Sequence, residues 1–464
     1  MEDKKRIVIL GAGETGVGAA LLAKAKGFVP FVSDAGKIIP RYKKILFENS
    51  ISLEEGQHNE EFLLTADEVI KSPGIPDRVD ILQKLREKNI PILSDIEFAC
   101  RFTNAKIIAI TGTNGKTTTA LLTYYIIKRS GLNVCLAGNI GISFAEKVID
   151  NEYDYYVLEV SSFQLDYIQK FKPDIAVLLN ITPDHLDRYD YNFQKYVESK
   201  FRITKNMTED DVLIYFEGDE VIKRYLDQHS IKPHKMGIAL NRLPEVNAFM
   251  NGRYLKFHLP PKRSREIKIS LNHISLKGPH NMVNVMAAIM TAKILKISDI
   301  KLKEALKSFE NVPHRLEKIG EINNIAFIND SKATNLDAAV KALSSFDQPI
   351  IWIVGGVDKG NNYEQFIDLV NNKVKDIICL GKDNSRIINA FKGLGKKIIE
   401  TTHMKKAVKH AFKLAIPGDI VLLSPACASF DLFKNYADRG DKFKNIVEKL
   451  NVHEEKKINK NNDA

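Results

Sequence analysis

Residues 109 to 120 read AITGTNGKTTTA, and this stretch decides the fold. The run AKIIAI at 105 to 110 predicts a buried strand, and the segment TALLTYYIIKRSG at 119 to 131 predicts a helix. A glycine-containing turn that ends in Gly-Lys-Thr between a strand and a helix is typical of a phosphate-binding loop. The usual spacing G-x-x-x-x-G-K-[ST] is shortened here, because Ile110 stands six positions before Lys116.

The residues of this loop suit the phosphates of a ligand. Gly112 and Gly115 allow the backbone to approach phosphate oxygens closely. Lys116 supplies a positive charge to the phosphates, and the hydroxyl of Thr117 can ligate magnesium. We therefore expect the segment between the strand and the helix to bind the phosphates of a ligand.

Length and composition indicate the number of domains and the general class of protein. The chain has 464 residues, which predicts about three domains. A hydrophobic fraction of 44% and a charged fraction of 27% are ordinary for a globular protein. The net charge of +10 favours anionic partners, but the lysines are scattered, so nucleic acid is not indicated.

Targeting and redox signals point to the cytoplasm. The N-terminus MEDKKRIVILGAG lacks the features of a signal peptide, and no run of 18 apolar residues predicts a membrane span. The four cysteines lie far apart without C-x-x-C spacing, as is typical of reduced thiols. We expect a cytoplasmic monomer.

Strand and helix patterns alternate through three blocks, which predicts α/β domains with parallel sheets. The predicted domains are residues 1–95, 96–311 and 312–464. The expected fold class is α/β, with a Rossmann-like N-terminal domain, a central ATPase-like parallel sheet with the phosphate loop, and a Rossmann-like C-terminal domain.

The first block carries Gly11-x-Gly13-x-x-Gly16 between the strand RIVIL and a helix, and the next strand ends at Asp34. These are marks of a dinucleotide fold. The pattern is weak by itself, since a tight strand–helix turn without a ligand would look the same. We favour a nucleotide or a sugar nucleotide as the ligand.

Further polar residues follow strands of the second block. Glu159 ends the strand YYVLEV, at the sheet edge where ligands gather in α/β folds, and a carboxylate there suits Mg²⁺. The loop NITPDHLDRY places Asp184, His185, Asp187 and Arg188 at the next strand end. That loop could also be a solvated turn, and Lys200 on the following helix would by default be an exposed surface lysine.

Three turns of the third block mix charged and small residues at strand ends. They are NDSKATN (329–335), GGVDKG (355–360) and SPACASFDLFKN (424–435). In the last of these we expect Ser429 to be the N-cap of a helix that begins at Phe430, whose free N–H groups could receive a carboxylate. Each turn could be ordinary, but three in one block favour a binding edge.

The combined motifs resemble those of the Mur ligases, and the resemblance spans all three blocks. The motifs are Gly112–Thr117, LEVSSFQL, NITPDHLDRY, GPHNMVN, PHRLE, NDSKATN and SPACASFDLFKN. The resemblance implies ATP-dependent amide bond formation in peptidoglycan precursor synthesis, through an acyl phosphate. The last two motifs indicate the kind of family member that joins D-glutamate to UDP-N-acetylmuramoyl-L-alanine, with ATP and two Mg²⁺ ions.

The resemblance also implies roles for individual residues. The catalytic residues are Lys116, His185, Lys200 and Lys332. The ATP contacts are Gly112, Thr113, Asn114, Gly115, Lys116, Thr117, Thr118, Asn281, Asn284, Arg315 and Asp330. The metal ligands are Thr117, Glu159, His185 and Lys200, the last as a carbamate. The contacts to the uridine diphosphate substrate are Gly13, Glu14, Thr15, Asp34, Lys37, Ser72, Gly74 and Asn139, and those to D-glutamate are Thr334, Lys359, Ser429, Phe430 and Tyr436.

Two departures from the family pattern stand out. Tyr436 falls where the family often carries Phe, which adds a hydroxyl near the amino acid. After Asp34, the residues Ala-Gly-Lys replace the Thr-Arg of well-known members, so Lys37 could supply the missing cation.

Other functions remain open on the sequence. Another Mur ligase, or an amide ligase like folylpolyglutamate synthetase, would use the same phosphate loop, although folate ligases lack the first block. A nicotinamide-dependent dehydrogenase would explain Gly11–Gly16 but not Lys116. A nucleotide-binding module without activity would leave the carboxylates and lysines at the strand ends unexplained.

Overall fold

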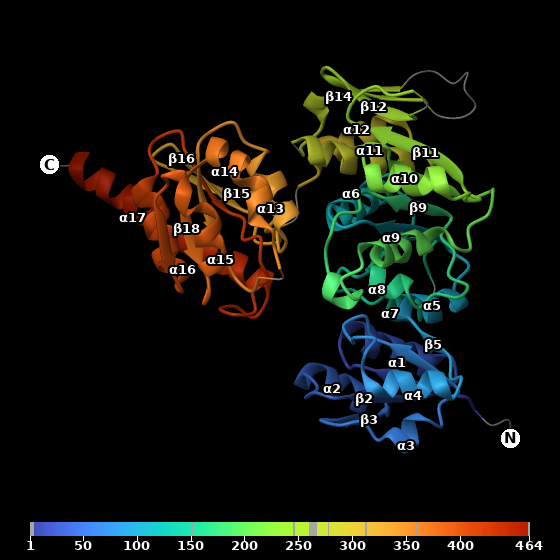
Figure 1. The fold of residues 1–464 in the computed structure, drawn as a ribbon. Coiled ribbons are helices and arrows are strands. Elements are labelled where there is room, and N and C mark those ends of the chain that lie inside the picture. The colour runs from blue at the N-terminus through green and yellow to red at the C-terminus, as the bar shows by residue number, and fades with distance from the viewer. Residues whose placement is uncertain are drawn as a thin grey trace. The chain divides into compact units, whose positions relative to one another are not determined.

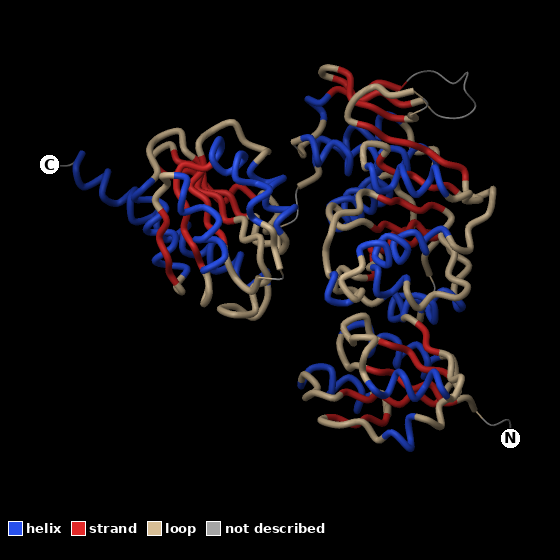
Figure 2. Tube along the Cα trace, viewed as in Figure 1, coloured by secondary structure: helices blue, strands red, loops and turns tan. Residues whose placement is uncertain are grey.

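The structure is a computed structural model that describes residues 4–150, 152–244, 246–258, 267–276, 278–310, 313–358 and 360–462 (Figure 1). The chain divides into two compact units, residues 1–309 and 310–464. The first unit contains two sheets and the second unit contains one. In both units helices lie along the sheets (Figure 2). Among the helices of the described residues, none combines the length and hydrophobicity needed to cross a bilayer.

The first sheet is parallel and has the order β3-β2-β1-β4-β5. Its strands are β1 (Arg6–Leu10), β2 (Val29–Asp34), β3 (Ser52–Glu55), β4 (Glu68–Lys71) and β5 (Ile92–Leu93). Its helices are α1 (Glu14–Ala25), α2 (Pro40–Glu48), α3 (Glu60–Leu63) and α4 (Asp80–Glu87). Strand β1 is the central strand, so the glycine turn that follows it lies at the middle of the edge formed by the carboxyl ends of the strands.

The second sheet has the order β14-β13-β12-β11-β10-β9-β6-β8-β7 and is parallel from β7 to β12. Its strands are β6 (Lys106–Thr111), β7 (Val134–Gly138), β8 (Tyr155–Glu159), β9 (Ile175–Leu178), β10 (Val212–Phe216), β11 (His234–Ala239), β12 (Ala248–Asn251), β13 (Tyr254–Phe257) and β14 (Ile267–Ser270). Its helices are α5 (Asp95–Ala99), α6 (Lys116–Arg129), α7 (Phe144–Val148), α8 (Ser162–Leu165), α9 (Phe193–Phe201), α10 (Glu220–Gln228), α11 (Pro279–Ile294) and α12 (Asp299–Ser308).

Strand β6 is the switch point of this sheet. The chain leaves β6 through α6 toward β7 and β8 on one side, and then crosses to β9 on the other side. Ligands of parallel α/β sheets bind in the crevice at such a point, outside the carboxyl ends of the strands. The topology therefore places the phosphate loop where a ligand is expected.

The second unit contains a six-stranded sheet of order β15-β16-β20-β17-β18-β19, parallel except for the pairing of β15 with β16. The strands are β15 (Glu317–Ile322), β16 (Ile325–Asn329), β17 (Ile350–Val354), β18 (Val374–Leu380), β19 (Ile398–Thr401) and β20 (Ile420–Leu423). The helices are α13 (Leu336–Leu343), α14 (Ile367–Lys373), α15 (Ser385–Phe391), α16 (Met404–Leu414) and α17 (Tyr436–Asn462). The predicted α/β class with three parallel-dominated sheets is confirmed.

The prediction of a helix beginning at Phe430 is wrong, because α17 begins at Tyr436. Residues 429 to 435 form turns, in which the N–H of Phe433 donates to the carbonyl of Ser429. Asn435 provides the cap, because its Oδ1 accepts from the N–H of Asp438 at 2.9 Å. Asn is an N-cap residue as favourable as Ser, so residue type alone did not show which of the two positions caps the helix.

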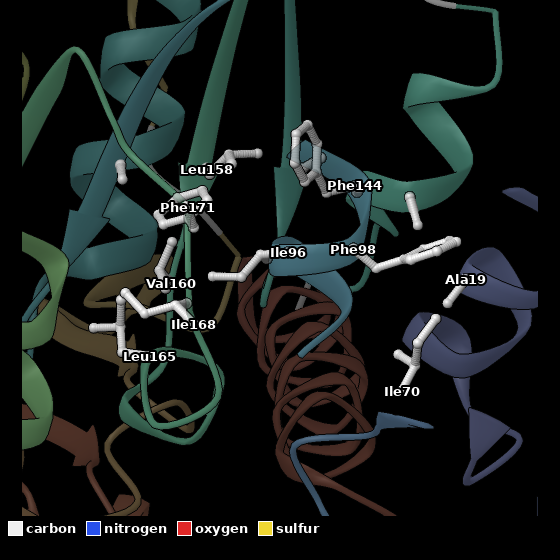
Figure 3. Close-up of a cluster of buried hydrophobic side chains, with 14 of the residues drawn as sticks. Ala19, Ile70, Ile96, Phe98, Phe144, Leu158, Val160, Leu165, Ile168 and Phe171 are labelled. Carbon is white, nitrogen blue, oxygen red and sulfur yellow. The ribbon is translucent and has the colours of Figure 1, made fainter. Parts of the chain in front are cut away.

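One apolar cluster joins the first sheet to the second (Figure 3). The side chains of Ile70 from β4, Ile96 and Phe98 from α5, and Phe144 from α7 are buried within it. Helices α1 and α7 approach closely, since a Cβ on Gly18 would lie 2.0 Å from Ser143 Oγ. The two sheets of the first unit therefore share a core, which fixes the loops of both sheet edges.

We predict that Phe98→Ala destabilises the first unit by about 3–5 kcal/mol, because it empties a buried aromatic site. Phe98 is 0% exposed, and its ring meets Phe28 at 5.9 Å and Phe102 at 5.2 Å between centroids. Urea unfolding monitored by circular dichroism measures the loss. Phe47→Ala is the control, because that ring is 63% exposed and its removal should change stability by less than about 0.5 kcal/mol. Equal stability of the two variants would contradict this account of the shared core.

Candidate active site

The phosphate loop has a backbone that only glycine accepts at two positions. Gly112 has φ 147° and Gly115 has φ 86°, both in the left-handed range. A Cβ on Gly112 would lie 3.1 Å from the Cβ of Leu179, and one on Gly115 would lie 2.4 Å from Asn284 Oδ1. The loop is therefore tightly enclosed, and Gly115 is the N-cap of α6, at the kind of helix N-terminus that favours an anion.

The loop is braced by Asn180, which the sequence analysis did not identify. Its Oδ1 accepts from the N–H of Asn114 at 2.8 Å, and its Nδ2 donates to the carbonyl of Asn114 at 2.9 Å. The N–H of Thr113 donates to the carbonyl of Asn180 at 2.8 Å. The Thr113 hydroxyl also bonds to the backbone of Thr182, so the strand end after β9 holds the loop in place before any ligand binds.

Two lysines converge on one carbonyl of the loop. Lys116 Nζ donates to Gly112 O at 2.7 Å and to Thr113 O at 2.8 Å. Lys200 Nζ, from α9, donates to the same Gly112 O at 2.9 Å. The interpretation of Lys200 as a surface lysine is wrong, because this residue is only 2% exposed. Burial, and then the charge of Lys116, holds the pKa of Lys200 well below its ordinary value.

Glu159 lies at the carboxyl end of β8, beside the loop. Its Oε1 accepts from Asn139 Nδ2 at 3.0 Å, and its charge stabilises the ammonium of Lys200. Its Oε2 is buried, and no donor in the described part of the chain reaches it. A buried carboxylate oxygen without a donor is costly, and a hard cation such as Mg²⁺ would satisfy it.

The described residues contain no group of three or more His, Cys, Asp and Glu side chains that could hold a metal. A cation at Glu159 would therefore need oxygen atoms from other sources, such as Thr117 and the phosphates of a nucleotide. Mg²⁺ is usually bound in this way, through one or two carboxylates together with substrate phosphates. The residues present thus fit a metal that arrives with ATP.

His185 lies on the loop that follows β9, in the left-handed conformation with φ 53°. Its side chain is 39% exposed, and its Nε2 is 3.7 Å from Asp184 Oδ2. The ring packs edge-on against Phe163 with centroids 5.2 Å apart. Asp184 adds a favourable charge at Lys200, so this loop contributes to the same electrostatic site.

Asn281 and Asn284 lie on α11, which packs against α6. They are 3% and 4% exposed, and Asn284 Nδ2 donates to Asn281 Oδ1 at 3.2 Å. The Oδ1 of Asn284 is the atom that leaves no room for a Cβ at Gly115. These two predicted ATP contacts therefore lie directly behind the phosphate loop.

The glycine turn after β1 is braced by Asp34, whose carboxylate accepts from the N–H groups of Ala12 and Gly36, each at 2.8 Å. Ser72 Oγ donates to Gly11 O at 3.2 Å. The carboxylate of Glu14 pairs with Arg41 at 3.0 Å. The remaining predicted contacts of this edge lie beside these, with Gly13 and Thr15 at the start of α1, and Lys37 and Gly74 exposed.

In the second unit most of the predicted residues follow β16 or β20 in the chain, and Arg315 precedes β15. Asp330 accepts from Ser424 Oγ at 2.8 Å, and burial raises its pKa to about 7 against the opposing charge of Arg315. Lys332 Nζ lies 5.5 Å from the ring centre of Tyr436. Of the other predicted residues, Thr334 is half-buried, Ser429 is buried, Phe430 is 73% exposed, and Lys359 lies outside the described residues.

Arg439 connects these two strand ends and was missed by the sequence analysis. It is 1% exposed, and it donates to Ser331 Oγ at 3.0 Å, Ser331 O at 2.9 Å and Cys427 O at 3.1 Å. It lies on α17, more than 100 positions from Ser331 in the chain. The sequence spacing offered no signal of this contact.

Comparison with family models covers most of the chain. Residues 5–94 match the MurD-like N-terminal domain of Mur ligases, residues 110–292 the Mur ligase middle domain, and residues 314–427 the Mur ligase glutamate ligase domain.

The chain belongs to the Mur ligase family.

This membership excludes the dehydrogenase interpretation of the glycine turn, because the first block matches a Mur ligase domain of its own. The phosphate loop and most of the turns of the second unit lie within domain models of the same ligase family.

Curated relatives of this Mur ligase are similar over their whole length. The UDP-N-acetylmuramoylalanine–D-glutamate ligase of Christiangramia forsetii is 47% identical over 446 residues, which is 96% of this chain and 100% of the relative. The enzyme of the same name from Bacteroides fragilis is 48% identical over 447 residues, with 96% and 100% coverage.

Solved structures share the fold. A pseudomurein peptide ligase type C from Methanothermus fervidus matches with a TM-score of 0.60 at 21% identity, over 96% of this chain and 100% of that one. The UDP-N-acetylmuramate-alanine ligase of Thermotoga maritima matches with a TM-score of 0.59 at 17% identity, over 97% and 100%. At such identities the likeness shows the fold alone.

Proposed function

We propose that this Mur ligase joins D-glutamate to UDP-N-acetylmuramoyl-L-alanine, with ATP as the second substrate, in peptidoglycan precursor synthesis in the cytoplasm. The relatives that are 47–48% identical over 96% of this chain carry this activity in their names. The products are ADP, phosphate and the new amide. We assign residues 1–95 to the uridine nucleotide, 96–311 to ATP and 312–464 to the amino acid.

The convergence of Lys116 and Lys200 on Gly112 O, beside the unsatisfied Oε2 of Glu159, is the observation that carries this proposal. A carboxylate is a poor electrophile until it receives a leaving group. The alanyl carboxylate attacks the γ-phosphorus of ATP, the bond to the bridging oxygen breaks, and an acyl phosphate and ADP result. Lys116 stabilises the negative charge that develops on the transferring group.

We assign Thr117, Glu159, His185 and Lys200 as the residues that would hold Mg²⁺ at the same site. When bound, it neutralises charge on the phosphoryl oxygens. We propose that Lys200 contributes as a carbamate. Its burial favours the neutral amine, which can add to CO₂ and release a proton, and this converts a cation into an oxygen ligand. Two ions are the expected number.

We assign binding of the nucleophile, D-glutamate, to the second unit. The amine of D-glutamate attacks the acyl phosphate as a neutral group, and phosphate leaves from the tetrahedral intermediate. Its two carboxylates require fixed donors that aim the amine. We assign this role to Thr334, Lys359, Ser429, Phe430 and Tyr436. Arg439 supports the assignment, because it ties the strand ends that carry Ser429 and Lys332 to the start of α17.

The acyl phosphate is tested by trapping. The protein is incubated with ATP, Mg²⁺ and UDP-N-acetylmuramoyl-L-alanine without D-glutamate, and borohydride is added. An acyl phosphate is reduced to the alcohol, whereas the free carboxylate is not, so the alaninol derivative is expected in the mass spectrum only when ATP is present. Its absence, with full turnover on later addition of D-glutamate, would contradict this reaction path.

We predict that Lys359→Ala raises KM for D-glutamate by roughly 100-fold, because it removes a charge that pairs with one carboxylate. KM for ATP should change by less than about threefold, and Ser429→Ala should raise KM for D-glutamate less than Lys359→Ala does, since it removes a neutral hydroxyl rather than a full charge. Steady-state phosphate release at varied D-glutamate and varied ATP measures both constants. An equal rise of the two KM values in Lys359→Ala would contradict the assignment of this turn to the amino acid.

A further inference from the structure

Arg188 makes an unusual set of contacts with a single turn. Its Nη2 donates to Ile75 O at 2.8 Å and to Pro73 O at 3.3 Å, and its Nη1 donates to Gly74 O at 3.4 Å. The three carbonyls belong to consecutive residues that follow β4. A planar guanidinium, with several fixed donors, is suited to hold such a group of acceptors.

The same guanidinium also packs on an aromatic ring that contacts His185. Its Cζ lies 4.3 Å above the ring centre of Phe163, and the ring of Phe163 meets His185 edge-on at 5.2 Å. Within the described residues, Arg188 has no carboxylate at ion-pair distance. Its charge is therefore directed at the carbonyls of the turn and at the aromatic face.

The turn that Arg188 holds is also tied to the first sheet. Ser72 N donates to Leu10 O at 3.0 Å, and Ser72 Oγ donates to Gly11 O at 3.2 Å. Residues 72 to 75 therefore contact the glycine turn on one side and Arg188 on the other. Arg188 lies three positions after His185 in the loop that follows β9.

We infer that Arg188 is a positioning residue that sets the turn of residues 73–75 relative to His185. This inference rests on the proposed function, because the turn carries predicted contacts to the uridine nucleotide and the loop carries a predicted metal ligand. By holding both, Arg188 places the alanyl carboxylate of the nucleotide substrate at the reacting end of ATP. An error of about 1 Å in such a placement lowers turnover strongly.

A second arginine, Arg86, also links the segment after β4 to a residue of the second-sheet region. It makes no hydrogen bond to residues 73–75, which all lie in the described part of the chain. Arg86 Nη2 donates to Tyr167 OH at 2.7 Å, and its Nη1 reaches Asp77 O at 3.5 Å. The buried ammonium of Lys71 also pairs with Asp77 at 3.3 Å. Arg86 thus stabilises the junction as a whole, and Arg86→Met is a matched control for Arg188→Met.

Kinetics give the first readout. Arg188→Met should raise KM for UDP-N-acetylmuramoyl-L-alanine by roughly 10- to 100-fold and lower kcat, while KM for ATP stays within about threefold. Arg188→Lys keeps the charge and should recover part of the loss. Arg86→Met should have the kinetic constants of the parent. The inference would be overturned if Arg188→Met had the KM and kcat of the parent. It would also be overturned if Arg86→Met changed these constants as much as Arg188→Met does.

Hydrogen–deuterium exchange gives a readout that needs no turnover. Peptides that contain residues 72–75 should exchange faster in Arg188→Met than in the parent, and those in Arg86→Met should not. Unchanged exchange in Arg188→Met would overturn the inference even if the proposed reaction holds. If the parent protein formed no product, the proposed function would be wrong. The exchange measurement would still decide whether Arg188 holds the turn of residues 73–75. If Arg188→Met did not fold, Arg188→Lys would decide alone, with a KM raised at least threefold as support and a parent-like KM as refutation.

Discussion

Lys116→Ala should lower kcat at least roughly a thousandfold, because it removes a charge that acts mainly in the transition state. Lys116 Nζ lies 2.7 Å from Gly112 O, inside a loop enclosed by Leu179 and Asn284. Lys200 Nζ also donates to Gly112 O, at 2.9 Å, but it comes from α9 and is assigned a different role. Phosphate release at saturating ATP, nucleotide substrate and D-glutamate measures the loss.

Lys106→Ala is the control for this variant. Lys106 is an exposed lysine at the start of the same strand, β6, and its removal leaves the loop intact. Its kcat should equal that of the parent. Turnover in Lys116→Ala at the parent rate would show that the shortened loop is not the catalytic phosphate cradle.

Lys200→Ala should be nearly inactive, with a loss comparable to that in Lys116→Ala, and should recover partly when formate or acetate is added. A short carboxylate can enter the space left by the side chain and supply the oxygen ligands of the missing carbamate. The buried position of Lys200, 2.9 Å from Gly112 O, makes this space part of the site. Turnover as a function of carboxylate concentration measures the recovery.

Lys195→Ala is the matched control, since Lys195 lies on the same helix, is exposed and pairs with Asp190 at 2.7 Å. Neither its activity nor its response to acetate should differ from the parent. Full activity in Lys200→Ala would remove this lysine from the site. If Lys200→Ala lost activity and no added carboxylate of any size restored it, the proposal of a carbamate on Lys200 would be contradicted.

The sequence predicted the parts of the site that depend on local pattern. The strand, loop and helix from Lys106 to Arg129 follow from hydrophobic periodicity and two glycines, and they are present in the structure. Glu159 was correctly placed at a strand end, because it terminates an apolar run. Its position next to β6 and β7, opposite Ile110 and Gly138, comes from the register of the sheet.

Contacts between distant segments could not be predicted in this way. Asn180 pairs with Asn114 across 66 positions, and Arg439 binds Ser331 across 108 positions. The burial of Lys200 depends on the packing of α9 against the loop, which no property of the helix sequence reveals. The start of α17 was misplaced, because Ser429 and Asn435 are both acceptable caps and only the packing of the turn between them decides.

The most direct test measures phosphate release with ATP, Mg²⁺ and UDP-N-acetylmuramoyl-L-alanine across a panel of amino acids. The panel contains D-glutamate, L-glutamate, L-alanine, L-lysine and diaminopimelate. The proposed function predicts rapid release, matched by formation of the amide, with D-glutamate, and little with the others. Ready turnover with L-lysine or diaminopimelate in place of D-glutamate would contradict the assigned substrate and the role of the second unit.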